Sequence, residues 1–245
     1  MPITYSPGDR YAVLGMSGTG KTVFVVTLSA LLVPAYADES DWQCWWLDTK
    51  DDPADIAMLH EWGFREPSQR TSGRASSRLI YYLRGSREDV YEQAQGLSDQ
   101  AMARRGILLV YDEYNHVTKS RQDAGPAVED VHKRGRGLDV GMCGGVQEPV
   151  LVPRFLFSQA IHRALFGLEH LPDIKIAREL CPKYAKGWPD IRDITTPHTH
   201  GFWLRSGPQG GDDNSWHYWP HVAAWHNSVT RPASEPCRAS SPVLS

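Results

Sequence analysis

The sequence predicts an α/β fold with a mostly parallel central sheet and helices on both of its faces. Short apolar runs alternate along the chain with longer segments of helical composition. The first apolar run ends in a glycine-rich turn that opens into a helix-like segment, and a later apolar run ends in two adjacent acidic residues. We expect these two strand ends to form the two halves of one site.

The expected elements follow in chain order. Lys21–Val33 lacks Gly and Pro and is stopped by Pro34, which predicts a helix. Gly207–Asn214 is a Gly- and Asp-rich turn between two strand-like runs and predicts a C-terminal β-hairpin. The other expected helices are Ser86–Arg105 and Ala127–Lys133, and Pro67–Ser77 is expected to be a polar loop. The expected strands are Tyr11–Leu14, Cys44–Leu47, Leu79–Leu83, Ile107–Tyr111, Val140–Val146, Ala164–Leu168 and Phe202–Leu204.

The chain of 245 residues fits one large domain, which we expect to span residues 1–226. Residues 227–245 are rich in Ser, Pro and Arg, have little to bury, and are expected to be a disordered tail. No apolar run reaches the roughly 20 residues that cross a membrane, so a soluble protein is expected. The cysteines include no C-x-x-C pair and are expected to be reduced thiols: Cys44, Cys143, Cys181 and Cys237.

A phosphate-binding loop is the most specific motif. The pattern G-x-x-x-x-G-K-[ST] is matched between a strand and a helix by Gly15, Met16, Ser17, Gly18, Thr19, Gly20, Lys21 and Thr22. Its glycines allow successive backbone N–H groups to face phosphate oxygens. Lys21 is expected to reach the β- and γ-phosphates of ATP, and the Thr22 hydroxyl is expected to bind Mg²⁺. The motif therefore predicts a RecA-like P-loop NTPase fold.

An acidic pair at the end of the Ile107–Tyr111 strand supplies the second half of the site. Asp112 is expected to hold the Mg²⁺ shell, through water, and Glu113 to polarise the attacking water as a general base. A strand that merely ends in a solvated acidic pair is the alternative. The phosphate-binding loop upstream favours the catalytic interpretation, so the two motifs together predict ATP hydrolysis.

A third segment contains Gly135, Arg136, the apolar strand Val140–Val146, Gln147 and Pro149, with eleven residues from the arginine to the glutamine. This segment resembles the FtsK–HerA superfamily of DNA-translocating ATPases, which carries a Gly-Arg turn, an apolar strand and a terminal Gln followed shortly by Pro. Asp48-Thr-Lys50, after the second strand, is similar to the family's Asp-x-Lys at that place, and the resemblance runs from about Tyr11 to Leu168.

The resemblance implies roles for two of these residues. Gln147 is expected to hydrogen-bond the γ-phosphate or the attacking water and so to sense the γ-phosphate. Arg136 is expected to reach the nucleotide of a neighbouring subunit and neutralise transition-state charge there. Arg134 is the nearest rival for that role, and a solvated charge in a basic run is the alternative for Arg136. An arginine that acts on a neighbour implies a homo-oligomer, for which a hexamer is expected.

The resemblance also implies that double-stranded DNA passes through a central pore. Candidate pore contacts are the Lys119-Ser-Arg121 segment and the two arginines Arg70 and Arg74, with a solvated loop as the alternative for each. The formal net charge of −3 slightly weakens a DNA-binding interpretation. It does not exclude a motor that touches DNA only through a few loops.

The expected function is an ATP-driven translocase of double-stranded DNA. The short chain resembles the genome-packaging ATPases of tailless icosahedral viruses with internal membranes, which implies packaging into a preformed capsid. Expected locations are the host cytoplasm or the virion, and further expected partners are capsid or membrane-vertex proteins. A conjugation- or secretion-type ATPase and a non-translocating ATP-binding switch remain as alternatives.

Histidines and tryptophans gather near the C-terminus, at His198, His200, Trp216–His221, Trp225 and His226. Their spacings match no standard metal-ligand set, and no acidic or Cys partner completes one. We therefore expect them to pack at a subunit or capsid face.

Overall fold

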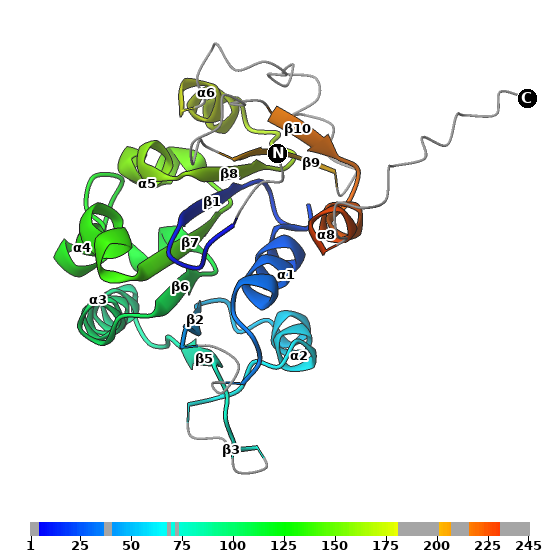
Figure 1. Cartoon of the computed structure of the whole chain (residues 1–245). Helices are drawn as coiled ribbons and strands as arrows, with labels where there is room; N and C mark the ends of the chain where they lie inside the picture. Colours follow the sequence, from blue (N-terminus) through cyan, green and yellow to red (C-terminus); the bar gives the residue numbers. More distant parts are fainter. Residues whose placement is uncertain are drawn as a thin grey trace, which may run out of the picture.

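The computed structural model describes residues 5–36, 41–67, 70–71, 74–180, 201–206 and 216–230. Its centre is an eight-stranded sheet in the order β10-β9-β8-β1-β7-β6-β2-β5 (Figure 1). The strands are β1 Arg10–Leu14, β2 Gln43–Asp48, β5 Arg78–Tyr82, β6 Ile107–Tyr111, β7 Val140–Val146, β8 His162–Leu165, β9 Phe202–Ser206 and β10 Trp216–Trp219. The strands from β8 to β5 run parallel, whereas β9 and β10 pair antiparallel. This arrangement confirms the predicted fold class with its C-terminal hairpin, whose turn lies outside the described residues.

Helices cover both faces of the sheet, as predicted (Figure 1). Helices α1 Lys21–Leu32, α2 Pro53–Glu61 and α8 Val222–Thr230 bury apolar side chains in one core. Helices α3 Arg87–Arg104, α4 Pro126–Arg134, α5 Arg154–Gln159 and α6 Leu171–Leu180 bury theirs in a second core on the opposite face. The central strands are buried from both sides, which explains why β6 and β7 are almost purely apolar.

Several short elements were not predicted. Helix α2 begins after Asp52, whose side chain accepts a hydrogen bond from the Ala54 amide at 2.8 Å, with Pro53 in the first turn. The expected polar loop Pro67–Ser77 contains the paired strands β3 Arg70–Thr71 and β4 Arg74–Ala75. The 3₁₀ helices are η2 Tyr114–Val117, η3 Gly135–Leu138 and η4 Pro149–Leu151.

The C-terminal boundary lies later than predicted. Helix α8 continues to Thr230, so the expected start of the tail at residue 227 falls inside it; residues 231–245 lie outside the described part. Trp225 explains the helix because its fully buried ring packs on Phe24 of α1, with 4.7 Å between ring centroids. The prediction that Trp225 packs at an external face is therefore wrong, since this tryptophan belongs to the core. His198 and His200 lie outside the described residues.

Strand β8 begins two residues earlier than predicted, with the polar pair His162 and Arg163. His162 is buried because its Nε2 lies 3.2 Å from Oδ2 of the buried Asp9 and its ring stacks on Tyr11. Among the described residues, no helix is both long and apolar enough to cross a membrane.

Candidate nucleotide-binding site

The loop between β1 and α1 has a backbone that only glycine adopts readily. Gly18 and Gly20 have φ values of 74° and 95°, in the left-handed region. At Gly15 an added Cβ would lie 2.5 Å from the Cβ of Phe166, so no larger residue fits. Gly20 provides no side-chain cap for α1, which leaves the first amides of that helix to bind an anion.

Lys21 is the first residue of α1 and is 6% exposed. Its Nζ donates a hydrogen bond of 2.6 Å to the Met16 carbonyl, which also accepts from the Thr19 hydroxyl at 2.8 Å. Burial lowers the pKa of Lys21 to about 8, and the nearby Glu113 carboxylate partly opposes that shift. Thr22 follows in the first turn of α1 and is partly buried. The lysine therefore lies over the loop, where a phosphate group would replace the carbonyl as its acceptor.

Asp112 and Glu113 directly follow β6 and are almost completely buried. Burial raises the pKa of Asp112 to about 6, although Lys50 lowers it, and burial also raises the pKa of Glu113. Oδ2 of Asp112 and Oε2 of Glu113 are buried and have no hydrogen-bond partner among the residues that the structure describes. Such oxygens are costly unless a cation or donor satisfies them, and hard oxygen ligands are what Mg²⁺ prefers. The residues therefore fit a magnesium ion held beside the phosphate-binding loop.

Gln147 directly follows β7, the strand that lies between β1 and β6. Its backbone N–H donates to Oε1 of Glu113 at 3.2 Å. The close approach of the two strands depends on Gly145, where an added Cβ would lie 2.4 Å from the Asp112 carbonyl oxygen. The structure thus brings the predicted residues Lys21, Asp112 and Gln147 to the same edge of the sheet.

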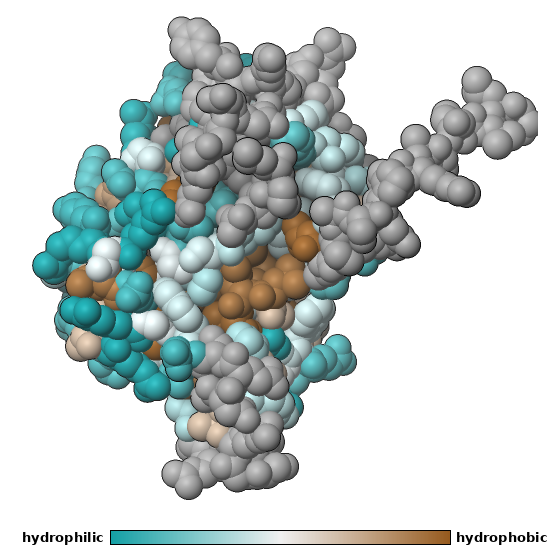
Figure 2. Space-filling view, viewed as in Figure 1, coloured by the Kyte–Doolittle hydropathy of each residue, from teal (hydrophilic) through white to brown (hydrophobic). Residues whose placement is uncertain are grey.

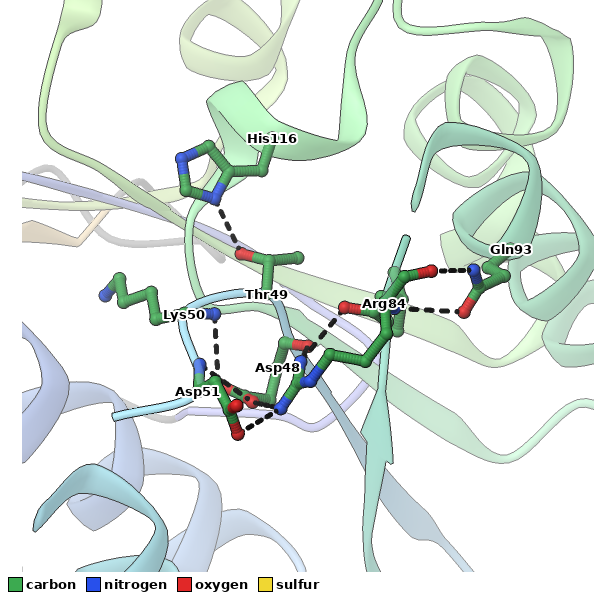
Figure 3. A network of polar contacts seen from close by, with 8 residues as sticks. Asp48, Thr49, Lys50, Asp51, Arg84, Gln93 and His116 are labelled. Carbon is green, nitrogen blue, oxygen red and sulfur yellow. Dashed lines mark hydrogen bonds and ion pairs between the residues drawn. The ribbon is translucent and has the colours of Figure 1, made fainter. Parts of the chain in front are cut away.

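A polar network at the end of β2 was not predicted (Figure 3). Asp48 is buried and accepts from the Arg84 guanidinium at 2.8 Å, while the Thr49 hydroxyl lies 2.9 Å from His116 Nδ1. The side chain of Lys50 points away from Arg84 (Figure 3). Its Nζ lies 3.1 Å from Oδ1 of Asp112. The resemblance marked Asp48 and Lys50 but gave them no partners, because their contacts depend on which strands are neighbours.

Arg136 lies at the opposite edge of the sheet. It belongs to η3, immediately before β7, so the seven residues of β7 separate it from Gln147, a length of about 23 Å. Its Nε lies 3.7 Å from Oδ1 of Asp9, and its side chain is 48% exposed. Arg134 is also exposed and pairs with Asp130. Neither arginine joins Lys21 and Glu113 within one chain.

The predicted pore residues are dispersed. Lys119 forms an ion pair with Glu88 at 2.8 Å and lies over the ring of Tyr91, whereas Arg121 is exposed. Arg70 and Arg74 lie in the β3–β4 hairpin, at the β5 end of the molecule (Figure 1). Among the described residues, no group of three His, Cys, Asp or Glu side chains is placed to ligate a metal ion, so a magnesium ion beside Asp112 would take most of its ligands from phosphate and water.

The parallel sheet, the glycine loop and the helix that it opens define the P-loop ATPase fold. The chain is similar to the solved structure of B204, the DNA-packaging ATPase of Sulfolobus turreted icosahedral virus, with a TM-score of 0.64 and 13% identity over 88% of this chain and 98% of that one. B204 of Sulfolobus turreted icosahedral virus 2 in complex with ATP-γS matches with a TM-score of 0.59 and 11% identity, again over 88% and 98%.

The fold is also shared with a second ATPase. EssC (ATPases 2 and 3) of Geobacillus thermodenitrificans matches with a TM-score of 0.55 and 12% identity over 89% of this chain and 40% of that one. No family model and no curated protein matches the sequence. At these identities the likeness establishes the fold alone, and that fold is the predicted P-loop ATPase fold.

Proposed function

We propose that the chain binds Mg-ATP at Gly15–Thr22 and hydrolyses it. The observation that carries the proposal is the meeting of Lys21, Asp112 and Glu113 at one edge of the sheet, with two carboxylate oxygens buried and unsatisfied. A purely structural acidic pair would be solvated or fully hydrogen-bonded, because unpaired buried carboxylates destabilise a fold. Destabilisation by unpaired buried charges is typical of a functional site, where a bound ligand satisfies them.

The residues have separate tasks in this proposal. The loop amides and Lys21 bind the phosphates, while Thr22 and Asp112 hold the magnesium ion, which neutralises phosphate charge when bound. Glu113 accepts a proton from the attacking water through Oε2, because Oε1 already accepts a hydrogen bond from the backbone N–H of Gln147. The raised pKa of Glu113 suits this role, since a stronger base accepts a proton more readily near neutral pH.

The proposed use of this hydrolysis is translocation of double-stranded DNA, most specifically packaging of a viral genome into a preformed capsid. The fold shared with the DNA-packaging ATPase B204 supports this, because the match extends over nearly the whole of that chain. We further propose a homo-oligomer, most simply a hexameric ring, in which Arg136 of one subunit serves the nucleotide of the next. The placement of Arg136 and Glu113 at opposite edges of the sheet supports such a head-to-tail assembly.

A conjugation- or secretion-type ATPase is the second candidate, and the likeness to EssC favours it. The two proposals differ in whether duplex DNA is the substrate of the motor. A non-translocating ATP-binding switch is a third possibility, which a hydrolysis assay distinguishes.

The test is the rate of ATP hydrolysis with and without long duplex DNA across a salt series. The packaging proposal predicts that DNA raises the rate and that the rise fades with added salt, because contacts to DNA phosphates release counterions. Equal rates at every salt concentration would favour the secretion motor, and no hydrolysis would favour the switch. Short duplexes of the same total base concentration are the matched control.

A further inference from the structure

Lys50 is a second lysine in the site whose role the proposed mechanism leaves open. Its Nζ lies 3.1 Å from Oδ1 of Asp112, and the side chain is only 18% exposed. This ion pair places the ammonium group of Lys50 inside the site, against the buried carboxylate of Asp112 and beside Glu113, the next residue along the chain.

The backbone at Lys50 is fixed, although its side chain is long and flexible. The Asp48 carboxylate accepts hydrogen bonds from the backbone N–H of Lys50, at 3.4 Å, and from the Arg84 guanidinium (Figure 3). The Thr49 hydroxyl forms a hydrogen bond with His116. The Lys50 ammonium can therefore exchange one acceptor for another by rotation of its four-carbon stem, with no movement of β2.

The charges of the site favour such an exchange. Asp112 cannot bind magnesium directly through the oxygen that pairs with Lys50, and a hydrated ion there would also compete with the lysine. Mg-ATP adds about two net negative charges beside the site, and Lys50 is the cation next to Asp112 that is free to follow them. Lys21 approaches from the phosphate-binding loop, whereas Lys50 approaches from the end of β2.

We propose that Lys50 is a second phosphate-binding lysine, which balances the Asp112–Glu113 pair before nucleotide binds and contacts the terminal phosphate once magnesium is bound. The inference rests on the proposed function, because it assigns a role in the same Mg-ATP site. The contact would distinguish ATP from ADP, because ADP lacks the phosphate that Lys50 would contact.

The experiment measures the binding of AMPPCP and of ADP to the whole chain by calorimetry in excess Mg²⁺. Lys50→Met is expected to weaken AMPPCP binding by about tenfold or more, which is the size of a lost hydrogen bond to a charged group. ADP affinity is expected to change less than threefold. The Mg²⁺ concentration needed for half-maximal ADP binding is expected to fall, because the lysine no longer competes for Asp112. Lys50→Arg, which keeps the charge, is expected to retain at least part of the preference for AMPPCP.

Arg84→Met is the matched control, because Arg84 is a cation of the same network that faces Asp48 and Asp51. It is expected to lower the melting temperature and to leave the ratio of the two affinities unchanged. If Lys50→Met does not fold, the double variant Lys50→Met with Asp112→Asn removes the unpaired carboxylate, and its ratio is compared with that of Asp112→Asn alone.

An unchanged ratio of affinities in Lys50→Met, with an unchanged Mg²⁺ requirement, would overturn the inference and assign Lys50 a purely structural role. That failure is distinct from failure of the proposed function. If the parent binds AMPPCP and Lys21→Ala does not, the nucleotide site stands without Lys50. If the parent itself binds neither nucleotide, the proposed function fails as well.

Discussion

The backbone N–H of Gln147 donates to Oε1 of Glu113 at 3.2 Å, and this bond joins the ends of β7 and β6. It leaves Oε2 of Glu113 as the free oxygen of the carboxylate. A backbone donor cannot be removed by changing the Gln147 side chain, so Glu113 keeps its orientation when that side chain engages a ligand. In the proposed mechanism, the backbone of Gln147 would therefore orient the base Glu113, while its side chain would sense the nucleotide.

Glu113→Gln is expected to retain nucleotide binding and lose at least about a hundredfold in turnover, because an amide cannot accept a proton from water. Nucleotide affinity and steady-state hydrolysis are measured on the same preparation. Glu148→Gln is the matched control, since Glu148 is exposed and has the same chemistry. Turnover at the parent rate in Glu113→Gln would show that the base is a different group.

Lys21→Ala is expected to abolish measurable ATP binding, because Lys21 is the buried cation of the loop and lies within 2.6 Å of the Met16 carbonyl. Equilibrium binding of a fluorescent ATP analogue is the measurement. Lys175→Ala, at an exposed position of α6, controls for loss of a positive charge. Tight binding of the analogue by Lys21→Ala would show that the loop does not bind the phosphates.

Arg136→Ala is expected to leave nucleotide affinity nearly intact and to lower kcat by about 10³-fold, the size attributed to arginine fingers. Mixing tests its action on a neighbour. Arg136→Ala subunits keep an intact loop and Lys21→Ala subunits keep an intact arginine, so mixed assemblies are expected to regain part of the activity. Arg134→Ala is the matched control. Co-assembly without any recovery would show that Arg136 does not act on a neighbouring subunit.

The stability of the folded protein is expected to fall in acid because of His132. This residue is buried, its Nε2 lies 2.9 Å from the Tyr114 hydroxyl, and burial lowers its pKa to about 3. The unfolded chain takes up a proton below its ordinary pKa of about 6.5, whereas the folded chain does not. Stability is therefore complete above about pH 6.5 and falls as the pH drops toward 3, by roughly 2 to 3 kcal/mol at pH 4.5.

Thermal unfolding of the parent and of His132→Gln between pH 7 and pH 4.5 measures this effect. The parent is expected to lose more melting temperature on acidification than the glutamine variant, which can keep a hydrogen bond to Tyr114. Parallel curves for the two proteins would mean that His132 is not a source of the acid sensitivity.

The elements predicted best from the sequence are those whose whole pattern lies in one contiguous segment. Val140–Val146 has its predicted bounds because an apolar, glycine-containing run can lie only in the middle of the sheet. The turn and helix start of the predicted phosphate-binding motif were found for a similar reason, since its glycines, its lysine and the start of α1 are contiguous. In both cases local chemistry was sufficient.

The sequence predicted less where contacts join distant segments. The pairing of Lys50 with Asp112 spans 62 residues and depends on β2 lying beside β6, which no local pattern determines. The early start of β8 at His162 depends likewise on the buried Asp9, 153 residues away. Helix α2 could have been found from Asp52 and Pro53 at its start, a capping signal that apolar periodicity alone does not reveal.

We propose that hydrolysis at this site moves the protein along duplex DNA. Displacement of a third strand from a triplex placed at increasing distances along a duplex tests it most directly, because displacement then requires travel. If the protein translocates on DNA, ATP-dependent displacement is expected for the parent, with a delay that grows with distance, and none is expected for Glu113→Gln. Vigorous ATP hydrolysis by the parent with no displacement at any distance would contradict it.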